Sequence, residues 1–296
     1  MIWGFAFVVQ RVGMESMQPV SFNGIRNLLA GLCLFPVSLL LDRQRGGKSV
    51  SRPEGKWKKT PSEKKQQTIA GLLCGIFLFL ASTLQQMGLV DTSAGKAGFI
   101  TALYVVLVPV TAFLLFRKNP GRWIWVSVFL AVIGLFLLCV PVGERFSLNK
   151  GDLLVLGCAI CFTGQILAVD TYASRVDPIR LSRDEFLVSG ILGILASLFC
   201  ETITLEGILG ALPSILYAGI VSGAIGYTLQ ILGQRDTNPT LASLLMCLES
   251  VFSALSGALV LGERMSSREA FGCVIMFSAV ILSQLSPLLR RRRTMA

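Results

Sequence analysis

Ten long apolar segments constrain the fold of this 296-residue chain more than any other feature. They cover residues 2–12, 20–41, 68–89, 94–116, 123–140, 153–173, 186–200, 208–232, 241–261 and 271–288. Most approach the roughly 20 residues with which an α-helix crosses a bilayer. The segments show no period-two alternation, and lipid offers backbone groups no hydrogen-bond partners, so helices are expected rather than a barrel. The sequence therefore predicts an all-α polytopic membrane protein with ten transmembrane helices.

The net charge of +10 reflects membrane topology rather than nucleic-acid binding. If the first helix runs outward, the loops on the cytoplasmic side hold 20 of the 27 Lys and Arg residues, and the outer loops hold five. The largest cytoplasmic group lies in residues 42–66, and another is the run Arg290–Arg293. This positive-inside bias predicts a multi-pass protein of the cell membrane with both termini in the cytoplasm. Anionic lipid is an alternative partner for the final arginine run.

A short sequence occurs twice, 145 residues apart. The first copy is Thr83-Leu84-Gln85, Gly88, Asp91-Thr92 and Ala97; the second is Thr228-Leu229-Gln230, Gly233, Asp236-Thr237 and Ala242. Both copies lie where one apolar segment ends and the next begins. Such a repeat in a membrane chain indicates two similar halves with a site between them.

A second offset, of 159 residues, relates Pro19, Leu28 and Gly31 to Pro178, Leu187 and Gly190. Each half then holds five helices, and an odd number inverts the second half relative to the first. We expect an inverted 5+5 repeat: a first half in 1–141, a second in 152–288, and a basic cytoplasmic tail in 289–296. The offset also predicts that helix 1 lacks about seven residues at its start. A naturally short, tilted or re-entrant first helix is the alternative.

Several motifs occur in the order and spacing of one known family. They are Ile2-Trp3-Gly4-Phe5-Ala6-Phe7, Pro19 with Gly24-Ile25-Arg26-Asn27-Leu28-Leu29, Gly88-Leu89 with Ala97-Gly98-Phe99, Val108-Pro109-Val110, Leu248-Glu249-Ser250-Val251-Phe252 and Leu261-Gly262-Glu263-Arg264. By these motifs nearly the whole chain resembles the EamA family of the drug/metabolite transporter superfamily. Ser250 departs from the proline that many relatives carry. The resemblance implies ten helices in inverted halves, a central cavity, and secondary transport of small metabolites such as amino acids.

Glu249 and Arg26 stand out among the charged side chains inside apolar segments, where ionisable groups are costly and usually functional. Glu249 could bind a cationic group or carry a proton, since the chain has no histidine; a structural hydrogen bond is the alternative. Arg26 could attract a substrate carboxylate or extend to the membrane interface. Its equivalent in the second half is Glu185, of opposite charge.

Amides and aromatic side chains complete the candidate binding site. The predicted substrate-binding residues are Trp3, Arg26, Gln85, Tyr104, Gln165, Tyr227, Gln230 and Glu249. For the glutamines, hydrogen bonding between helices is an equal alternative. For the aromatic residues, packing or anchoring at the interface is the alternative. We expect Asp91-Thr92 and Asp236-Thr237 to cap the helices that follow them.

Enzymatic function has little support in the sequence. The chain contains no histidine, so a Ser-His-Asp triad is impossible, and Gly95-Lys96 lacks the flanking residues of a phosphate-binding loop. No cofactor and no catalytic residue or metal ligand is predicted. We expect a secondary transporter that exports a small organic metabolite by alternating access, as a monomer or homodimer, with protons as a candidate coupling ion. The alternative is a non-transporting membrane protein, either a scaffold or a lipid-modifying enzyme.

Overall fold

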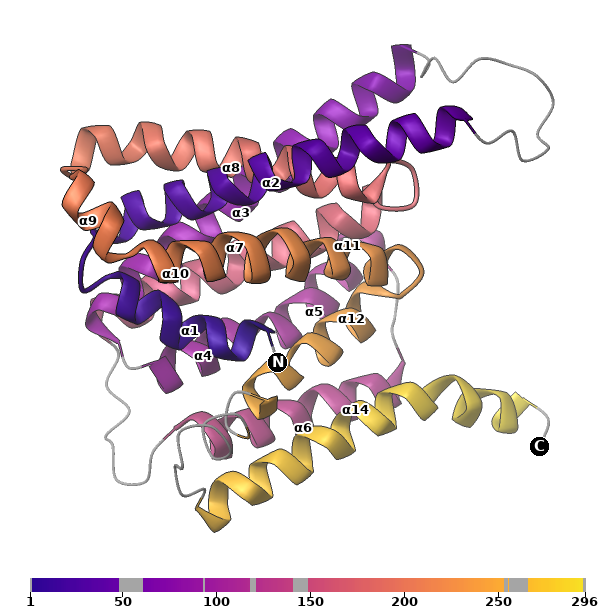
Figure 1. Cartoon of the computed structure of the whole chain (residues 1–296). Helices are drawn as coiled ribbons and strands as arrows, with labels where there is room; N and C mark the ends of the chain where they lie inside the picture. Colours follow the sequence, from indigo (N-terminus) through magenta and orange to yellow (C-terminus); the bar gives the residue numbers. More distant parts are fainter. Residues whose placement is uncertain are drawn as a thin grey trace. The chain divides into compact units, whose positions relative to one another are not determined.

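The computed structural model describes residues 2–47, 61–92, 94–117, 121–140, 149–252, 255 and 266–294. Within these residues the chain forms helices and no strand (Figure 1). Seven helical segments are long and apolar enough to cross a membrane: Pro19–Leu41, Lys64–Asp91, Lys96–Leu115, Arg122–Cys139, Lys150–Tyr172, Leu212–Arg235 and Ser267–Leu285. The prediction of an all-α membrane fold is confirmed at this level.

Three of the ten predicted spans are not among these seven segments. Ile2–Gly13 and Pro239–Phe252 are shorter apolar helices, and residues 256–261 of the predicted ninth span lie outside the described residues. The third is α8 (Pro178–Cys200), which begins eight residues before the predicted start at Phe186. Its first turns carry four charged residues, Arg180, Arg183, Asp184 and Glu185. They make that part of the helix too polar to count as membrane-spanning by composition.

The chain divides into two compact units, and each unit draws on both halves of the sequence. The first comprises Met1–Arg11, Leu84–Leu167 and Thr237–Ala296; the second comprises Val12–Thr83 and Ala168–Asp236. The boundaries fall inside the helices α1 (Ile2–Gly13), α3 (Pro61–Asp91) and α7 (Lys150–Tyr172). These units are therefore different from the two predicted sequence halves.

The centre of the second unit is a close pair of helices, α2 (Pro19–Gly47) and α8, which lie side by side in Figure 1. A Cβ atom added to Gly24 would meet the backbone of Gly193 at 2.8 Å, and one added to Gly190 would meet the backbone nitrogen of Leu28 at 2.5 Å. Gly31 approaches Leu187 in the same way. Along these contacts, residue numbers increase in α2 as they decrease in α8, so the two helices are antiparallel. Glycine at these positions allows their backbones to touch.

The predicted eighth span is divided in the structure. It consists of α10 (Leu212–Leu216), a π-helix η1 (Tyr217–Tyr227) and α11 (Thr228–Arg235), and it follows the short helix α9 (Leu205–Gly210). A π-helix of 11 residues is uncommon, since most π-helical segments are single turns, often at functional sites. Gly219 of η1 contacts the Arg26 carbonyl of α2. The absence of a side chain at Gly219 therefore allows η1 to approach α2 closely.

The carboxylate of Glu201 joins the end of α8 to the start of α2. Its oxygens accept hydrogen bonds from the backbone N–H groups of Val20 at 2.9 Å and Ser21 at 2.7 Å. These N–H groups have no partner within their own helix, and a negative charge at a helix N-terminus is favourable. Both ends of this contact fall on the side of the membrane that the charge pattern assigns to the exterior.

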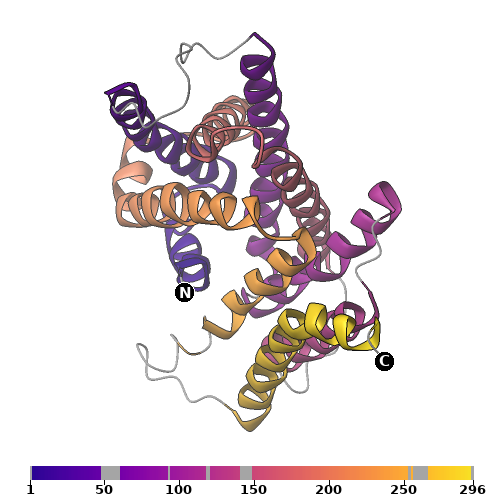
Figure 2. The ribbon, with the colours of Figure 1, turned by 90° about the vertical axis from the view of Figure 1, so that its right-hand side faces the viewer.

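The first unit has its own close helix pair, α6 (Arg122–Cys139) and α14 (Ser267–Thr294), seen side by side in Figures 1 and 2. Gly134 approaches Met276, and Gly272 approaches the backbone of Leu138, so this pair is also antiparallel. The guanidinium of Arg268 donates to the Val140 carbonyl at the end of α6. The backbone of α14 remains helical to Thr294, through the residues predicted as a basic tail.

The predicted helix cap in the second copy of the repeat is wrong. Asn238, rather than Asp236 or Thr237, caps α12 (Pro239–Met246), because its side-chain oxygen accepts from the Thr240 N–H at 2.9 Å. Asp236 instead pairs with the adjacent Arg235.

In the first copy, Thr92 contacts the start of α7, and Ser93, directly before the helix that begins at Ala94, lies outside the described residues. The Thr92 hydroxyl donates to Asp152 at 3.0 Å. There Asn149 and Asp152 each accept from the backbone N–H of the other, which forms a reciprocal cap, and Lys96 donates to Asp152 at 2.6 Å.

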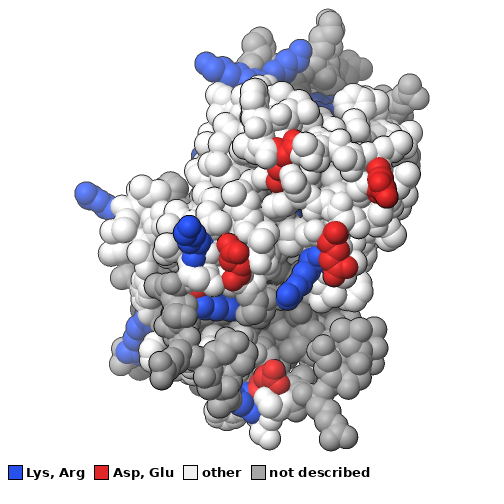
Figure 3. All heavy atoms as spheres, turned by 90° about the vertical axis from the view of Figure 1, so that its left-hand side faces the viewer, with Lys and Arg blue, Asp and Glu red and all other residues white. Residues whose placement is uncertain are grey.

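Many large apolar side chains remain exposed on the helices of both units, including Leu72, Ile76, Leu114, Ile191 and Leu198. On the face shown in Figure 3, the described side chains are mostly uncharged, with only scattered Lys, Arg, Asp and Glu. Continuous exposed apolar surface is costly in water, and it suits contact with lipid.

Candidate functional site

A buried polar cluster lies inside the second unit, with Asn23 of α2 at its centre. We define this Asn23 cluster as Asn23, Arg26, Asn27, Ser82, Thr83 and Ser189, all less than 9% exposed. The positions i, i+3 and i+4 place Asn23, Arg26 and Asn27 on one face of α2. The hydroxyls come from α3 and α8, so three helices converge on the cluster.

Every polar atom of the Asn23 side chain is used. Its amide nitrogen donates to the hydroxyls of Ser82 and Thr83, both at 3.0 Å. Its carbonyl oxygen accepts from Nε and Nη2 of Arg26, at 3.0 and 2.9 Å. Asn27 donates to Ser189 of α8 at 2.9 Å. This network holds the Arg26 side chain in a defined position.

Arg26 is a buried cation whose partners are neutral. Its side chain is 7% exposed, and its guanidinium lies 5.9 Å from the centre of the Phe22 ring. It forms no ion pair with any described residue, Glu185 included. Burial inside the unit also differs from the interfacial position that we considered as an alternative. A buried charge is costly without a partner of opposite sign, so the position favours an anionic ligand group.

Tyr227 and Gln230 lie in the same unit as Arg26. Tyr227 ends the π-helix η1, and its ring meets the edge of Phe186 with centroids 5.2 Å apart. Gln230 of α11 contacts Gln234 at 3.5 Å. Of the eight predicted site residues, the structure therefore brings Arg26, Tyr227 and Gln230 into one unit.

The first unit contains two equivalent helix breaks. The predicted fourth span is divided into α4 (Ala94–Ala102) and α5 (Tyr104–Phe116), with Leu103 between them. The ninth is interrupted at Cys247, 145 residues after Ala102. The Cys247 thiol donates to the Ala102 carbonyl at 3.7 Å, so the two breaks lie in contact. Helix interruptions free backbone groups, and in transporters they often occur at binding sites.

Tyr104 directly follows the break at Leu103, and Glu249 lies two residues beyond the break at Cys247; the two residues are related by the same offset of 145. Tyr104 is 5% exposed, and Glu249 is half-buried. The sequence singled out both residues but did not relate them to each other. Their equivalence makes the break region the second part of the candidate site.

The remaining predicted residues also lie in the first unit. Gln85 donates to the Thr101 hydroxyl at 3.2 Å, which is the helix-to-helix bond considered as its alternative role. Gln165 of α7 is fully buried, and Trp3 of α1 is half-buried. Gln86, by contrast, is fully buried, and neither its amide nitrogen nor its oxygen has a hydrogen-bond partner among the described residues. An unsatisfied buried amide calls for a ligand or water.

The residues that sequence reasoning missed are neutral: Asn23, Asn27, Ser82, Thr83 and Ser189. Single hydroxyls and amides are common in membrane helices, and up to 166 residues separate members of this set. One signal was available, because Asn23, Arg26 and Asn27 share a helix face at spacings of three and four.

These features define a multi-pass helical membrane protein with polar groups held inside its membrane-spanning helices. The sequence matches the profile of the EamA-like transporter family over residues 1–140 and again over 149–285. The chain therefore belongs to the EamA-like transporter family, as the sequence motifs predicted.

Relatives along the full length agree with this assignment. An uncharacterized transporter of Archaeoglobus fulgidus is 30% identical over 96% of this chain and 83% of its own. The uncharacterized inner membrane transporter YedA of Escherichia coli is 26% identical over 95% and 86% of the two chains. A solved crystal structure aligns with a TM-score of 0.70 at 17% identity, covering 98% of this chain and 96% of that one, and supports the fold alone.

Proposed function

We propose that this protein is a secondary transporter that exports a small, carboxylate-bearing organic metabolite, such as an amino acid, by alternating access. The observation that carries the proposal is the buried guanidinium of Arg26, held by Asn23 without an acidic partner. A carboxylate can accept two parallel hydrogen bonds from a guanidinium, and Arg26 keeps donors beyond the two that Asn23 accepts.

An inverted 5+5 repeat, with halves at 1–141 and 152–288, is the architecture in which we place this function. Its support is the pairing of equivalent helices. The second and seventh predicted helices, α2 and α8, run antiparallel in contact, and so do the fifth and tenth, α6 and α14. Helices related by inversion must run in opposite directions, and two such antiparallel pairs fit that relation.

The proposed orientation places both termini in the cytoplasm. Its support is that helix ends assigned to one side by the charge pattern meet in the structure. Gln67 donates a hydrogen bond to Asp184 at 3.1 Å. Gln67 follows the basic loop of residues 42–66, and Asp184 lies in the basic region of residues 175–185; the charge pattern assigns both regions to the cytoplasm. Lys96 and Asp152, assigned to the exterior, form an ion pair.

We propose Glu249 as the proton carrier, if transport is coupled to protons. The chain contains no histidine, so a carboxylate is the available group. The helix break at Cys247 leaves backbone groups beside Glu249 that can bind water or substrate. Facilitated diffusion without a coupling ion is the competing mechanism.

The decisive test is uptake of labelled amino acids, sugars and nucleosides by counterflow into proteoliposomes. Arg26→Met should raise the half-saturating concentration of a carboxylate substrate by about tenfold or more, because a hydrogen bond to a charged group contributes about 1.5–3 kcal/mol. Arg235→Met is the matched control, since Arg235 is 48% exposed and forms an ion pair with its neighbour Asp236. Equal flux in wild type and Arg26→Met would refute the role of Arg26, and no flux of any solute would refute transport.

A separate measurement tests coupling. With an imposed pH gradient, flux should exceed the flux without a gradient, and Glu249→Gln should remove the difference. Glu206→Gln is the control, because Glu206 is an exposed carboxylate in α9. If Glu249→Gln retained the full response to the gradient, the choice of Glu249 as carrier would be wrong.

A further inference from the structure

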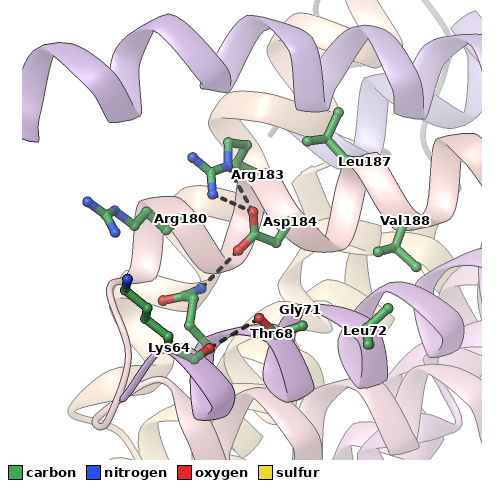
Figure 4. Close-up of a pocket in the computed structure, with 10 residues that line it drawn as sticks. Lys64, Thr68, Gly71, Leu72, Arg180, Arg183, Asp184, Leu187 and Val188 are labelled. Carbon is green, nitrogen blue, oxygen red and sulfur yellow. Dashed lines mark hydrogen bonds and ion pairs between the residues drawn. The ribbon is translucent and has the colours of Figure 1, made fainter. Parts of the chain in front are cut away.

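A pocket that contains none of the predicted site residues lies within the second unit, between the first turns of α3 and α8 (Figure 4). Its volume is about 470 Å³. Lys64 and Arg180 lie at the end near the start of the two helices, and Leu72, Leu187 and Val188 lie farther along them. One end of the pocket is therefore cationic and the other apolar.

The acidic group in the pocket is already neutralised. The Asp184 carboxylate accepts two bonds from Arg183, at 2.6 and 2.8 Å, and one from Gln67 at 3.1 Å. Arg183 is held further by the Ser38 hydroxyl and the Phe35 ring of α2. This pair builds the wall of the pocket, and Lys64 and Arg180 are the other two charged residues that line it.

Lys64 is the group best placed to meet that ligand. Its side chain is exposed, and its ammonium forms no hydrogen bond or ion pair with a described residue. It also begins the membrane-spanning part of α3, Lys64–Asp91, which places it where apolar and aqueous regions meet. A phosphate group of a lipid lies at the same depth.

The apolar end of the pocket continues along the surface of both helices. Leu72 is 47% exposed, and Ile76, one turn later on the same face of α3, is 43% exposed. On α8, Leu187 is followed one turn later by Ile191, which is 51% exposed. These side chains form two apolar tracks, one on α3 and one on α8. Both tracks run from the cationic end of the pocket along the helices, which is the direction that acyl chains would take.

We propose that this pocket binds an anionic phospholipid, with its headgroup phosphate at Lys64 and Arg180 and its acyl chains along Leu72 and Leu187. Charge complementarity selects an anionic headgroup, and the continuous apolar tracks select a lipid over a soluble phosphate. Basic pockets between membrane helices are known to hold anionic headgroups. A bound lipid would link α3 to α8 at the membrane surface.

Native mass spectrometry of the purified full chain tests the proposal, with phosphatidylglycerol and phosphatidylcholine of identical acyl chains as probes. Phosphatidylglycerol should bind several-fold more tightly. Lys64→Gln should weaken its binding about fivefold, the effect expected for one basic residue near a lipid surface, and Arg180→Gln should do likewise. Lys65→Gln is the matched control, because Lys65 is an exposed neighbour that does not line the pocket.

Three results would overturn the proposal: equal binding of the two lipids, an equal loss in Lys64→Gln and Lys65→Gln, or no loss in Lys64→Gln. Displacement of phosphatidylglycerol by millimolar glycerol 3-phosphate would also overturn it, since the ligand would then be a soluble phosphate. The measurement requires no transport, so its outcome is independent of the proposed transport function.

Discussion

The thiol of Cys247 contacts the carbonyl oxygen of Ala102, and the 145 residues between them are the offset of the sequence repeat. Two equivalent positions thus touch each other, and each marks the point where its helix is interrupted. The two-fold relation of the proposed inverted repeat would produce such a contact between equivalent residues at its axis. Within the first unit, the two helix breaks lie in direct contact.

Enlarging the side chain at this contact should destabilise the protein. Cys247 is fully buried, so Cys247→Leu adds volume where none is free and should cost about 1–3 kcal/mol. Thermal unfolding in detergent, followed by circular dichroism, measures the effect. Cys200→Leu, at an exposed cysteine in α8, should leave the midpoint unchanged. An unchanged midpoint in Cys247→Leu would mean that the breaks do not pack as described.

The contact between α2 and α8 depends on glycine at position 190. A Cβ atom there would lie 2.5 Å from a backbone nitrogen, so the helices must move apart. We expect Gly190→Ala to lower the free energy of unfolding by about 1–3 kcal/mol. Gly233→Ala, in α11 of the same unit, has no atom within 4 Å of its Cβ and should be neutral or stabilising by up to about 1 kcal/mol. Denaturant titration of both variants checks the contrast, and equal losses would contradict it.

The ion pair of Lys96 and Asp152 should contribute to stability. The Asp152 side chain is fully buried, and Lys96 is 13% exposed. Lys96→Met removes a hydrogen bond to a charged group and should cost about 1.5–3 kcal/mol. A double-mutant cycle with Asp152→Asn should show a smaller loss for the double variant than the sum of the single losses. Lys150→Met, at an exposed lysine of the same helix end, is the control, and additive losses would argue against the pair.

The cap that Glu201 provides to α2 can be tested in the same way. Glu201→Ala leaves the Val20 and Ser21 N–H groups without their acceptors and should cost about 0.5–2 kcal/mol. Glu201→Gln keeps one acceptor oxygen and should lose less. The readout is the unfolding midpoint at low ionic strength, with Glu206→Ala as the control. A larger loss in Glu201→Gln than in Glu201→Ala would contradict the cap.

The hydrophobic segments of the sequence predicted where the helices lie. They did not predict where each helix begins or where it is interrupted. The length and composition of a segment reflect its lipid surroundings. The interruptions at Leu103 and Cys247, by contrast, lie where two segments distant in the sequence contact each other. Contacts between distant segments are absent from a local pattern. The start of α8 at Pro178 has a local cause that hydropathy does not register, because the Asp177 side chain accepts from the N–H groups of Ile179 and Arg180.

The charged members of the candidate site were the easiest to predict from the sequence. Arg26 and Glu249 are conspicuous because a charge in an apolar segment is rare. Asn23, whose carbonyl oxygen fixes Arg26, is a neutral residue with many ordinary roles. The offset of 145 was available in the sequence and relates Tyr104 to Glu249, but the relation gains meaning only once the two helix breaks are seen.

The Glu201 cap also has a consequence for biosynthesis. Its carboxylate lies 181 residues beyond Val20 in the chain, and ribosomes add about 5–20 residues per second. The start of helix α2 is therefore synthesised roughly 10–40 s before its N-terminal acceptor exists, by the same rate. During that interval the Val20 and Ser21 N–H groups depend on water or lipid headgroups, and they exchange these for Glu201 when α8 arrives. Arrival of α8 thus supplies both the partner helix and the cap of α2 in one step of assembly.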